Sequence, residues 1–518
     1  MTEADPAVCQ AAPSFGPATA TFIVVSSMIG TGVLTTSGFT VAAVGSNQLM
    51  LILWVIGGLL AACGALTLCE LAAALPESGG DYVFLREAYG PLAAFLSGWV
   101  SFFIGFGGPI AAAAAASAKY LLAPLRLETP VATGMELGLA SAVIVGLGIV
   151  HCLGRQTTIR AQTGMTIVKL VILSGLAVAG LVAGRGGWTH VADRPPLSPG
   201  LVVAMGSALV YVSYAYTGWN AAAYVAGETA RPQQVMPKAI LLGTGLVTVL
   251  YLALNLAYAL ALPAADIRAL VAERGLDAVA PIAQLTAERL FGPRIADPLS
   301  VAIGITLMAS VSAFVLTGPR LAAAMAQAGQ FPAIAGRISA AGAPVAATVL
   351  QVGWALVLLW TASFETILLY AGVGLGIFSL LTVAAVFVLR VRRPDLPRPF
   401  RTPGYPFVPA IYLLGTGLLT AAVCWERPVV AAVSLASIAA GVPCYYLTAA
   451  MKRVYNSSRR PGYDACKTGR PTIYLTMIVR GEPHIVTRRL GARDGLCVAR
   501  RWAAGRRRSS SRWFVPRK

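Results

Sequence analysis

Charged residues are scarce in this chain of 518 residues, where they make up only 12% of the sequence. Average soluble proteins carry about twice that fraction. Hydrophobic residues account for 57%, and the mean hydropathy is +0.72. A composition so poor in charge excludes a disordered chain and argues against an ordinary soluble enzyme.

Groups that hold metals or perform catalysis are also few. The three histidines, His151, His190 and His484, avoid the middle of the long apolar runs, which argues against a histidine proton relay. The eight cysteines form no CxxC pair, so we interpret them as small core residues rather than as a metal site or a disulfide framework. The motifs HExxH, GxSxG and Walker A are absent. We therefore expect no enzyme activity, no metal and no cofactor.

The N-terminal sequence has no basic stretch of the kind that opens a secretory signal peptide. We expect residues 1–17 to form a short cytoplasmic segment and the first apolar run to remain in the mature protein.

The net charge of +19 is concentrated at one end of the chain. Residues 452–518 contain 18 basic and 3 acidic residues, whereas residues 1–451 contain 22 and 18. The whole-chain charge suggests a nucleic-acid binder, but the body is nearly neutral and we expect no nucleic-acid partner for it. We interpret residues 454–518 as a basic, disordered cytoplasmic tail. It has the basic residues to contact anionic lipid, and RNA binding or a non-functional extension are the alternatives.

Long apolar runs dominate the body, and a membrane-spanning helix needs about 20 such residues. About twelve segments qualify or nearly qualify. They lie at about 18–44, 47–74, 92–122, 137–153, 160–184, 199–226, 238–262, 297–325, 344–361, 365–390, 407–424 and 428–450. An even number of spans puts both termini on one side. Loops on that side carry more Lys and Arg, which predicts that both termini are cytoplasmic in a multi-pass protein of the cell membrane.

Two spans carry glycines beside polar residues near their centres. The first reads Met-Ile-Gly-Thr-Gly-Val at 28–33, and the sixth reads Tyr-Ala-Tyr-Thr-Gly-Trp-Asn at 214–220. Glycine is unfavourable inside a helix but suits a chain that must unwind and expose its backbone. Close helix packing is the alternative explanation for either glycine cluster. The two clusters lie five spans apart, at matching places in two halves, which predicts an inverted-repeat transporter with a midplane site.

Lys169 lies about nine residues into the fifth span. A lysine so deep in a membrane usually faces the protein interior, and burial disfavours its charged form. We interpret it as a proton-coupling group or as a fixed charge in place of a sodium ion, with snorkelling to the interface as the alternative. Lys119, near the outer end of the third span, is expected to snorkel. Glu70 and Glu228 are expected to pair with loop arginines and to hold or gate the inner face.

Four stretches resemble the amino acid–polyamine–organocation (APC) transporters, especially bacterial amino acid permeases and the L-type and cationic amino acid transporters. The resemblance covers about residues 18–450. Its four stretches are residues 28–33, residues 69–91 with Pro-Glu-Ser-Gly-Gly-Asp-Tyr, residues 214–237, and residues 398–406 with Arg-Pro-Phe-Arg.

The resemblance implies an all-α membrane protein with five plus five inverted helices, two extra helices, and unwound helices 1 and 6. Repeat one would cover about 18–184, repeat two about 199–390, and the extra helices about 407–450. Backbone groups at Gly30, Thr31 and Gly32 would bind a substrate carboxylate. The ammonium would meet carbonyls near Ile29 and Tyr214.

Tyr214 would also be the aromatic gate above the substrate. Lys169 matches the fifth-helix lysine of sodium-independent and proton-coupled members, and Asn220 matches a polar position after the sixth-helix break. Ala215, Thr217 and Gly218 complete the candidate binding segment. The chain departs from the family at Gly227-Glu228, where two glutamates are common, and at Gly318-Pro319-Arg320.

The sequence therefore predicts a secondary amino acid transporter that works by alternating access. Proton-coupled symport and exchange both remain open, as does the oligomeric state. No acidic residue is evident at mid-depth in the pocket helices, which favours neutral amino acids. The alternatives are a non-transporting amino acid sensor of the same fold, an amino acid/polyamine antiporter, and a membrane-embedded enzyme.

Overall fold

The computed structural model describes residues 15–126, 129–192, 198–361, 364–458, 472–479 and 482–489. The chain divides into two units, residues 1–448 and residues 449–518, which are described separately. The first unit is helical, and the largest of its hydrophobic clusters runs through most of its helices.

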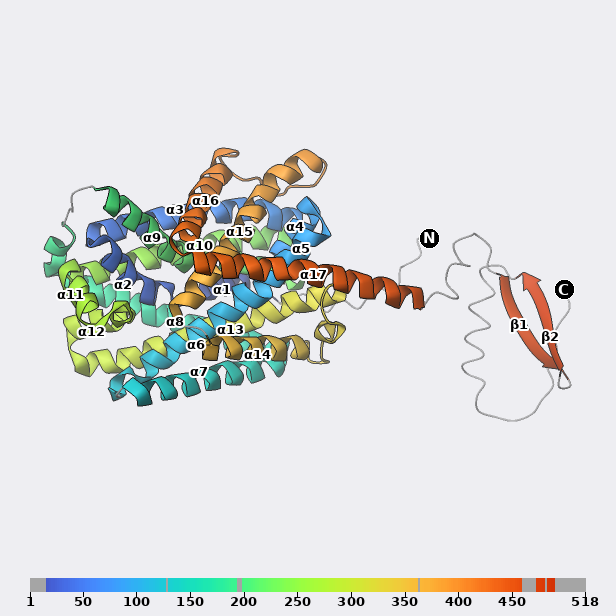
Figure 1. Ribbon diagram of the computed structural model, residues 1–518, viewed down its shortest axis with the longest axis horizontal. Coiled ribbons are helices and arrows are strands. Elements are labelled where there is room, and N and C mark those ends of the chain that lie inside the picture. Colours follow the sequence, from blue (N-terminus) through green and yellow to red (C-terminus); the bar gives the residue numbers. More distant parts are fainter. Residues whose placement is uncertain are drawn as a thin grey trace. The chain divides into compact units, whose positions relative to one another are not determined.

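Figure 1 shows the helices packed side by side, many of them running along the same direction. The α-helices are α1 (Pro17–Met28), α2 (Gly32–Val44), α3 (Asn47–Ala74), α4 (Asp81–Tyr89), α5 (Pro91–Val100), α6 (Gly107–Leu122), α7 (Thr129–Cys152), α8 (Arg155–Ala183), α9 (Pro199–Ala215), α10 (Pro232–Ala261), α11 (Ala264–Arg274), α12 (Ile282–Phe291), α13 (Pro293–Gln327), α14 (Val345–Thr361), α15 (Phe364–Arg392), α16 (Phe407–Glu426) and α17 (Pro428–Ser458). A π-helical segment, η1 (Ser101–Phe106), joins α5 to α6, and short 3-10 segments are η2 (Ala123–Leu125), η3 (Gly184–His190), η4 (Ala221–Glu228), η5 (Leu276–Val279) and η6 (Ala333–Gly336).

Ten helical segments in the described residues are long and apolar enough to cross a membrane. Two further apolar helices, α9 and α14, are shorter than a full span. These twelve segments coincide with the spans expected from the sequence, although the structure gives only ten of them full length. Helix α9 is short because it stops at Ala215, where the expected span 199–226 is interrupted.

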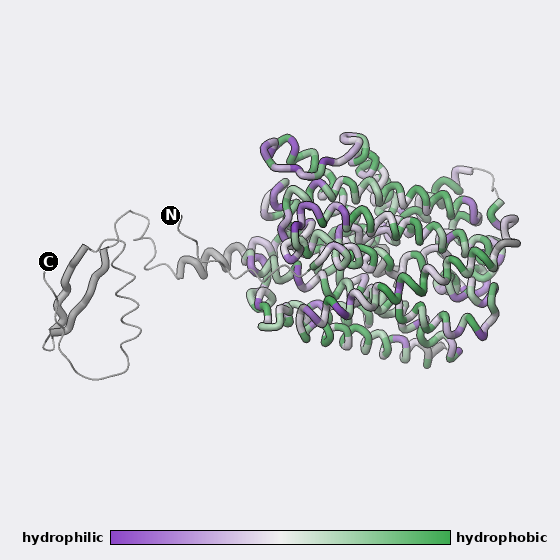
Figure 2. Tube along the Cα trace, turned by 180° about the vertical axis from the view of Figure 1, so that it is seen from behind, coloured by the Kyte–Doolittle hydropathy of each residue, from purple (hydrophilic) through white to green (hydrophobic). Residues whose placement is uncertain are grey.

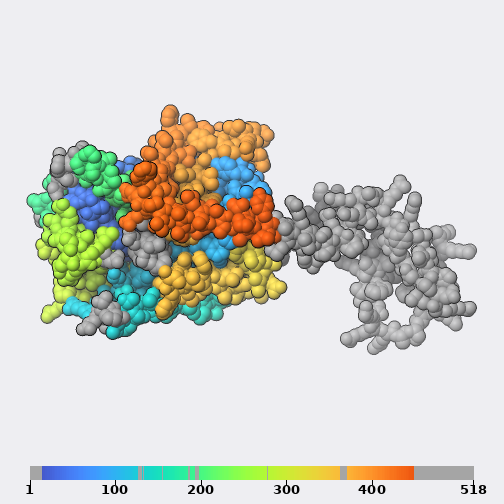
Figure 3. Space-filling view, in the orientation of Figure 1, coloured from blue at the N-terminus to red at the C-terminus, as the bar shows by residue number. Residues whose placement is uncertain are grey.

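The surface of the helices suits a lipid environment. Large apolar side chains are exposed on several helices, among them Leu59, Val171 and Trp425. Figure 2 shows hydrophobic residues along the length of the helices, with hydrophilic stretches mostly toward their ends. Helices α16 and α17 are the least buried of the candidate spans, and both are visible on the face shown in Figure 3.

Both interruptions predicted from the glycine clusters are present. The first span divides into α1 and α2 around Ile29–Thr31, and α9 is followed by turns at residues 216–220 before η4 begins. Gly218 has φ +102°, and a Cβ there would lie 2.8 Å from the Ser27 carbonyl carbon and oxygen. Only glycine fits a backbone conformation and a contact of this kind. The two interruptions therefore touch each other.

The second unit contains a two-stranded antiparallel sheet of β1 (Thr472–Val479) and β2 (Glu482–Arg489). Thr472 pairs with Arg489, and Val479 pairs with Glu482. These two segments are strands in the structure, where no regular structure was expected from the sequence. The first of them, Thr-Ile-Tyr-Leu-Thr-Met-Ile-Val, is rich in β-branched residues and ends just before Arg-Gly, which favours a strand followed by a tight turn. Helix α17 also continues to Ser458, beyond the expected boundary at 453, and the rest of the tail lies outside the described residues.

Candidate functional site

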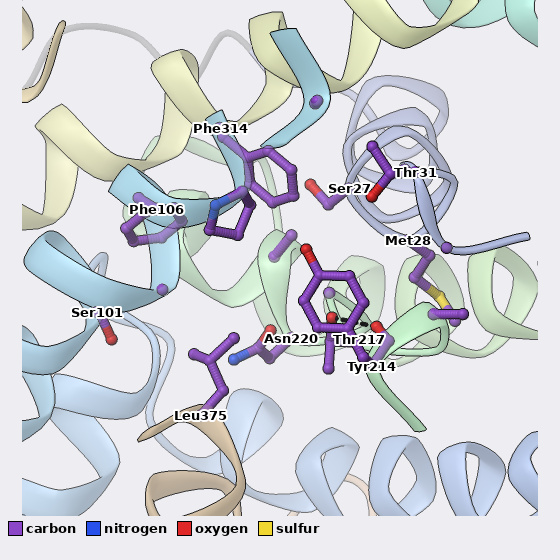
Figure 4. A pocket seen from close by; sticks show the side chains of 18 of the residues that line it. Ser27, Met28, Thr31, Ser101, Phe106, Tyr214, Thr217, Asn220, Phe314 and Leu375 are labelled. Atoms are coloured by element: carbon purple, nitrogen blue, oxygen red, sulfur yellow. Dashed lines mark hydrogen bonds between the residues drawn. The ribbon is translucent and has the colours of Figure 1, made fainter. Parts of the chain in front are cut away.

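A cavity of about 50 Å³ lies where the two interruptions meet, and Figure 4 shows it from close by. Eight of the nine predicted binding residues line it. They are Gly30, Thr31, Gly32, Tyr214, Ala215, Thr217, Gly218 and Asn220. Side chains from other helices complete the wall, including Ser101, Phe106 and Tyr224. Tyr214 stands between the two broken segments in this view (Figure 4).

The first interruption presents the beginning of a helix to the cavity. Thr31 is the N-terminal cap of α2, and its side chain makes no capping hydrogen bond. The first N–H groups of a helix have no acceptor within the helix, and they form the positive end of its dipole. A Cβ at Gly30 would meet no atom within 4 Å, so the backbone there stays open to a ligand, whereas the missing Cβ of Gly32 makes room for Ala215 of the second interruption. The arrangement suits an anionic group such as a carboxylate.

Ile29 lies next to the cavity but does not line it. Its carbonyl oxygen accepts hydrogen bonds from Lys169 Nζ at 2.6 Å and from Ser310 Oγ at 2.7 Å. A carbonyl has two lone pairs, so both are used.

Lys169, in α8, contacts the backbone of the first interruption. It is only 1% exposed, and its Nζ also donates to Ser26 O at 3.2 Å and Ser310 Oγ at 2.8 Å. An ammonium has three donors, and these contacts use all of them. No carboxylate pairs with it in the described part of the chain. Lys169 therefore faces the interior and does not snorkel, whereas Lys119 is exposed near the end of α6.

Tyr251 joins the two interruptions, and sequence reasoning missed it. Its hydroxyl lies 2.5 Å from Met28 O and 3.0 Å from Ala215 O, one carbonyl from each broken segment. The residue is fully buried in α10. Nothing in the apolar run of α10 marks this tyrosine, because its two partners come from distant parts of the chain.

The second interruption is tied by its own threonine. Tyr214 O accepts from Thr217 N at 3.0 Å and from Thr217 Oγ1 at 2.7 Å. Tyr214, Thr217, Gly218 and Asn220 also line a second cavity of about 120 Å³, which is adjacent to the first.

Asp81 brings a buried carboxylate to this second cavity. Its Oδ2 accepts from Asn220 Nδ2 at 2.8 Å and from Tyr224 OH at 3.2 Å. Burial raises the pKa of Asp81 to about 6, and the hydrogen bonds from Asn220 and Tyr224 oppose this shift. The sequence-based expectation concerned the pocket helices, and Asp81 lies outside them, at the start of α4, from where it reaches the second cavity.

The two glutamates predicted as gating residues lie outside both cavities. Glu70 is 2% exposed and makes two hydrogen bonds with Arg390, at 2.9 and 2.7 Å, and a third with Thr402 N at 2.8 Å. Glu228 pairs with Arg320 at 3.0 Å. Arg320 belongs to α13 and Arg390 to α15, so these two partners are helix arginines and not loop arginines. Arg398, in the segment after α15, does lie 3.4 Å from Glu70. The segment Gly318-Pro319-Arg320 thus contributes an ion pair, and the gating role of both glutamates stays a prediction.

Comparison with known proteins identifies the family. The family model described as amino acid permease matches residues 15–449. The chain is 30% identical over 436 residues to the large neutral amino acids transporter small subunit 2 of Mus musculus, covering 82% of this chain and 79% of that protein.

Two further relatives are similar over the same region. The serine/threonine exchanger SteT of Bacillus subtilis (strain 168) is 28% identical over 434 residues, with 82% and 94% of the two chains covered. The human cystine/glutamate transporter is 26% identical over 431 residues, with 82% and 83% covered. These relatives are transporters and not enzymes, and the protein is a multi-pass integral membrane protein. From the match to the family model and the 30% identity, the chain belongs to the amino acid permease family of the APC superfamily.

Proposed function

We propose that the protein moves amino acids across the cell membrane by alternating access, with the substrate bound between the two interrupted helices. The observation that carries this proposal is the cavity shared by both interruptions, where the start of α2 and the turns after α9 face each other. The printed names of the relatives, which describe transporters and exchangers of amino acids, support it.

The proposed architecture is a five-plus-five inverted repeat followed by two extra helices. Repeat one would span about 18–184, repeat two about 199–390, and the extra helices about 407–450. The matching positions of the two interruptions, each in the first span of its half, support this division. The excess of Lys and Arg on one side supports cytoplasmic termini.

The substrate carboxylate would bind at the N–H groups of Gly30, Thr31 and Gly32, and the Gly30 N–H would exchange its present hydrogen bond with Met28 O, at 2.8 Å, for one with the substrate. Its ammonium would lie toward the second interruption, near Tyr214 and Asn220. A cavity of about 50 Å³ has room for about four water molecules, which favours a small neutral amino acid. Tyr214, which lines both cavities, would be the aromatic gate.

Lys169 would act as the coupling group. It supplies a positive charge to the Ser26 and Ile29 carbonyls, as a bound sodium ion would, so we expect sodium-independent transport. Loss of its proton would weaken the contact with Ile29 and loosen the first interruption. Proton-coupled symport and exchange both fit this role, and the name of the Bacillus relative supports exchange. Glu70 and Glu228, through their ion pairs with arginine, would hold the inner gate.

Uptake by purified protein in proteoliposomes tests the proposal. A panel of labelled amino acids is offered with and without an inward proton gradient, and with or without unlabelled amino acid inside. Uptake of small neutral amino acids is expected, and stimulation by internal substrate identifies exchange. Binding without uptake would indicate the sensor, and exchange of amino acid for polyamine would indicate the antiporter. If no amino acid is bound or transported, the proposal is wrong.

A further inference from the structure

A buried carboxylate outside the proposed transport machinery forms a hydrogen bond with a pocket residue. Asp81 is 6% exposed and begins α4, and it lines the second cavity but not the first. Asn220 lines both cavities. The Asp81 carboxylate therefore reaches the first cavity through two residues that line it, Asn220, which donates to it at 2.8 Å, and Tyr224, which donates at 3.2 Å.

The chemistry of this bond decides how the Asn220 amide is turned. An ionised carboxylate can only accept hydrogen bonds, so it must face the NH₂ group of Asn220 and not its carbonyl oxygen. Tyr224 also donates to this carboxylate oxygen, at 3.2 Å, so the oxygen acts as an acceptor toward both neighbours. In Figure 4 the Asn220 nitrogen is turned away from the Tyr214 ring. The carbonyl oxygen, Oδ1, is left without a hydrogen-bond donor among the described residues.

Two of the carbonyl acceptors at the interruptions are occupied. The Ile29 carbonyl accepts from Lys169 and Ser310, and the Tyr214 carbonyl accepts two hydrogen bonds from Thr217. In the first cavity, Asn220 Oδ1 and the Ser27 hydroxyl, which also has no hydrogen-bond partner in the described part of the chain, remain available to a ligand group that donates a hydrogen bond.

We propose that Asp81 is a positioning residue that presents the Asn220 carbonyl oxygen to the bound amino acid, as the acceptor for a hydrogen-bond donor of the substrate. This inference rests on the proposed transport function. The donor is the ammonium of the substrate or a hydroxyl on its side chain. Either group can donate a hydrogen bond to Asn220 Oδ1. Asp81 does not touch the substrate, so its effect is on the KM for substrates rather than on the rate of turnover.

Uptake of alanine and serine by reconstituted Asp81→Asn tests the proposal. An amide at position 81 can donate as well as accept, so it no longer imposes one orientation on Asn220. We expect the KM to rise about tenfold, the cost of one hydrogen bond, with kcat within about twofold of the wild type. A rise for both substrates identifies the ammonium as the donor, and a rise for serine alone identifies the hydroxyl.

Two further variants separate positioning from a general loss of charge or stability. Glu77→Gln removes the same charge from an exposed residue of the preceding loop, which pairs with Arg86, and it should leave both KM values unchanged. The exchange of the pair, Asp81→Asn with Asn220→Asp, again places an acceptor-only group beside an amide, with the acceptor now toward the first cavity. It should restore the KM for the affected substrate to within about threefold of the wild type.

Unchanged KM values in Asp81→Asn would overturn the inference while wild-type uptake leaves the proposed function standing. Absence of uptake and binding by the wild type would instead overturn the proposed function. If Asp81→Asn is not monodisperse after purification, the double variant Asp81→Asn with Asn220→Asp provides the test of the positioning role. Uptake near the wild-type KM supports the positioning role, and monodisperse protein that does not bind either amino acid contradicts it.

Discussion

The two interrupted helices are stabilised in opposite ways. The first is held by the Lys169 ammonium, which donates to the Ser26 and Ile29 carbonyls from α8. The second is tied by the neutral Thr217 and reached by the Asp81 carboxylate through Asn220. A positive group thus supports one broken segment and a negative group supports the other. The proposed substrate site lies between them, and such an arrangement suits a zwitterion with a carboxylate and an ammonium.

The contact between the two segments should be the most sensitive point. Gly218→Ala forces a Cβ within 2.8 Å of the Ser27 carbonyl, at a φ of +102° that other residues rarely adopt. We expect a loss of about 3 kcal/mol or more in the free energy of unfolding and loss of uptake. Thermal unfolding in detergent and uptake in proteoliposomes measure the two effects.

Gly30→Ala is the matched control for the stability effect, because a Cβ at Gly30 meets no atom within 4 Å. Equal destabilisation by the two substitutions would contradict the idea that the segments are pressed together at Gly218.

Removal of the positive group should affect the first segment alone. Lys169→Ala leaves the Ile29 carbonyl with Ser310 as its remaining donor, and we expect uptake to fall about a hundredfold because charged hydrogen bonds are worth about 1.5–3 kcal/mol each. The residual uptake should no longer respond to a proton gradient.

Lys119→Ala removes an equal charge from an exposed position and should change uptake by less than about twofold. If Lys169→Ala retains both the wild-type rate and its response to the gradient, the coupling role is wrong.

Tyr251→Phe sharpens the comparison, because this hydroxyl contacts one carbonyl from each segment. We expect the free energy of unfolding to fall by about 1–2 kcal/mol, as for other buried hydrogen bonds. Tyr258→Phe is the control on the same helix. The Tyr258 hydroxyl is buried and has no hydrogen-bond partner in the described part of the chain, so its removal should cost little. If Tyr258→Phe lowers the free energy of unfolding more than Tyr251→Phe does, the Tyr251 bridge between the segments is unimportant for stability.

The smallest expected effect is the pH dependence due to Asp81. Its pKa is raised from 3.8 to about 6 in the folded protein, so the folded state binds the proton more tightly than the unfolded state. Between pH 7 and pH 5 the Asp81 contribution to stability should therefore increase by about 1 kcal/mol. Thermal unfolding of the wild type and Asp81→Asn at the two pH values isolates this contribution. An identical pH dependence in both proteins would contradict the burial of an ionisable group at this position.

Sequence reasoning was most successful where a signal is local. The glycines at 30, 32 and 218 predicted both interruptions, and the twelve apolar runs matched the helices, because hydrophobic length and helix-breaking residues are properties of short segments. The depth of Lys169 in its span also predicted that it faces the interior. The hairpin in the tail was missed, although its β-branched residues carried a signal, because only its length was weighed against a membrane span.

The roles of Asp81 beside the second cavity and of Tyr251 between the two interruptions became visible only in the tertiary structure. Asp81 follows α3, and it meets Asn220 across 139 positions of the chain, while Tyr251 meets Met28 across 223. The partner of Glu228 likewise comes from α13. The sequence by itself determined the membrane-spanning helices, the two interruptions and the candidate binding segments, since these follow from local composition. The tertiary structure decided which carbonyls already hold hydrogen bonds and which charges support each segment, because such contacts join residues that are far apart in the chain.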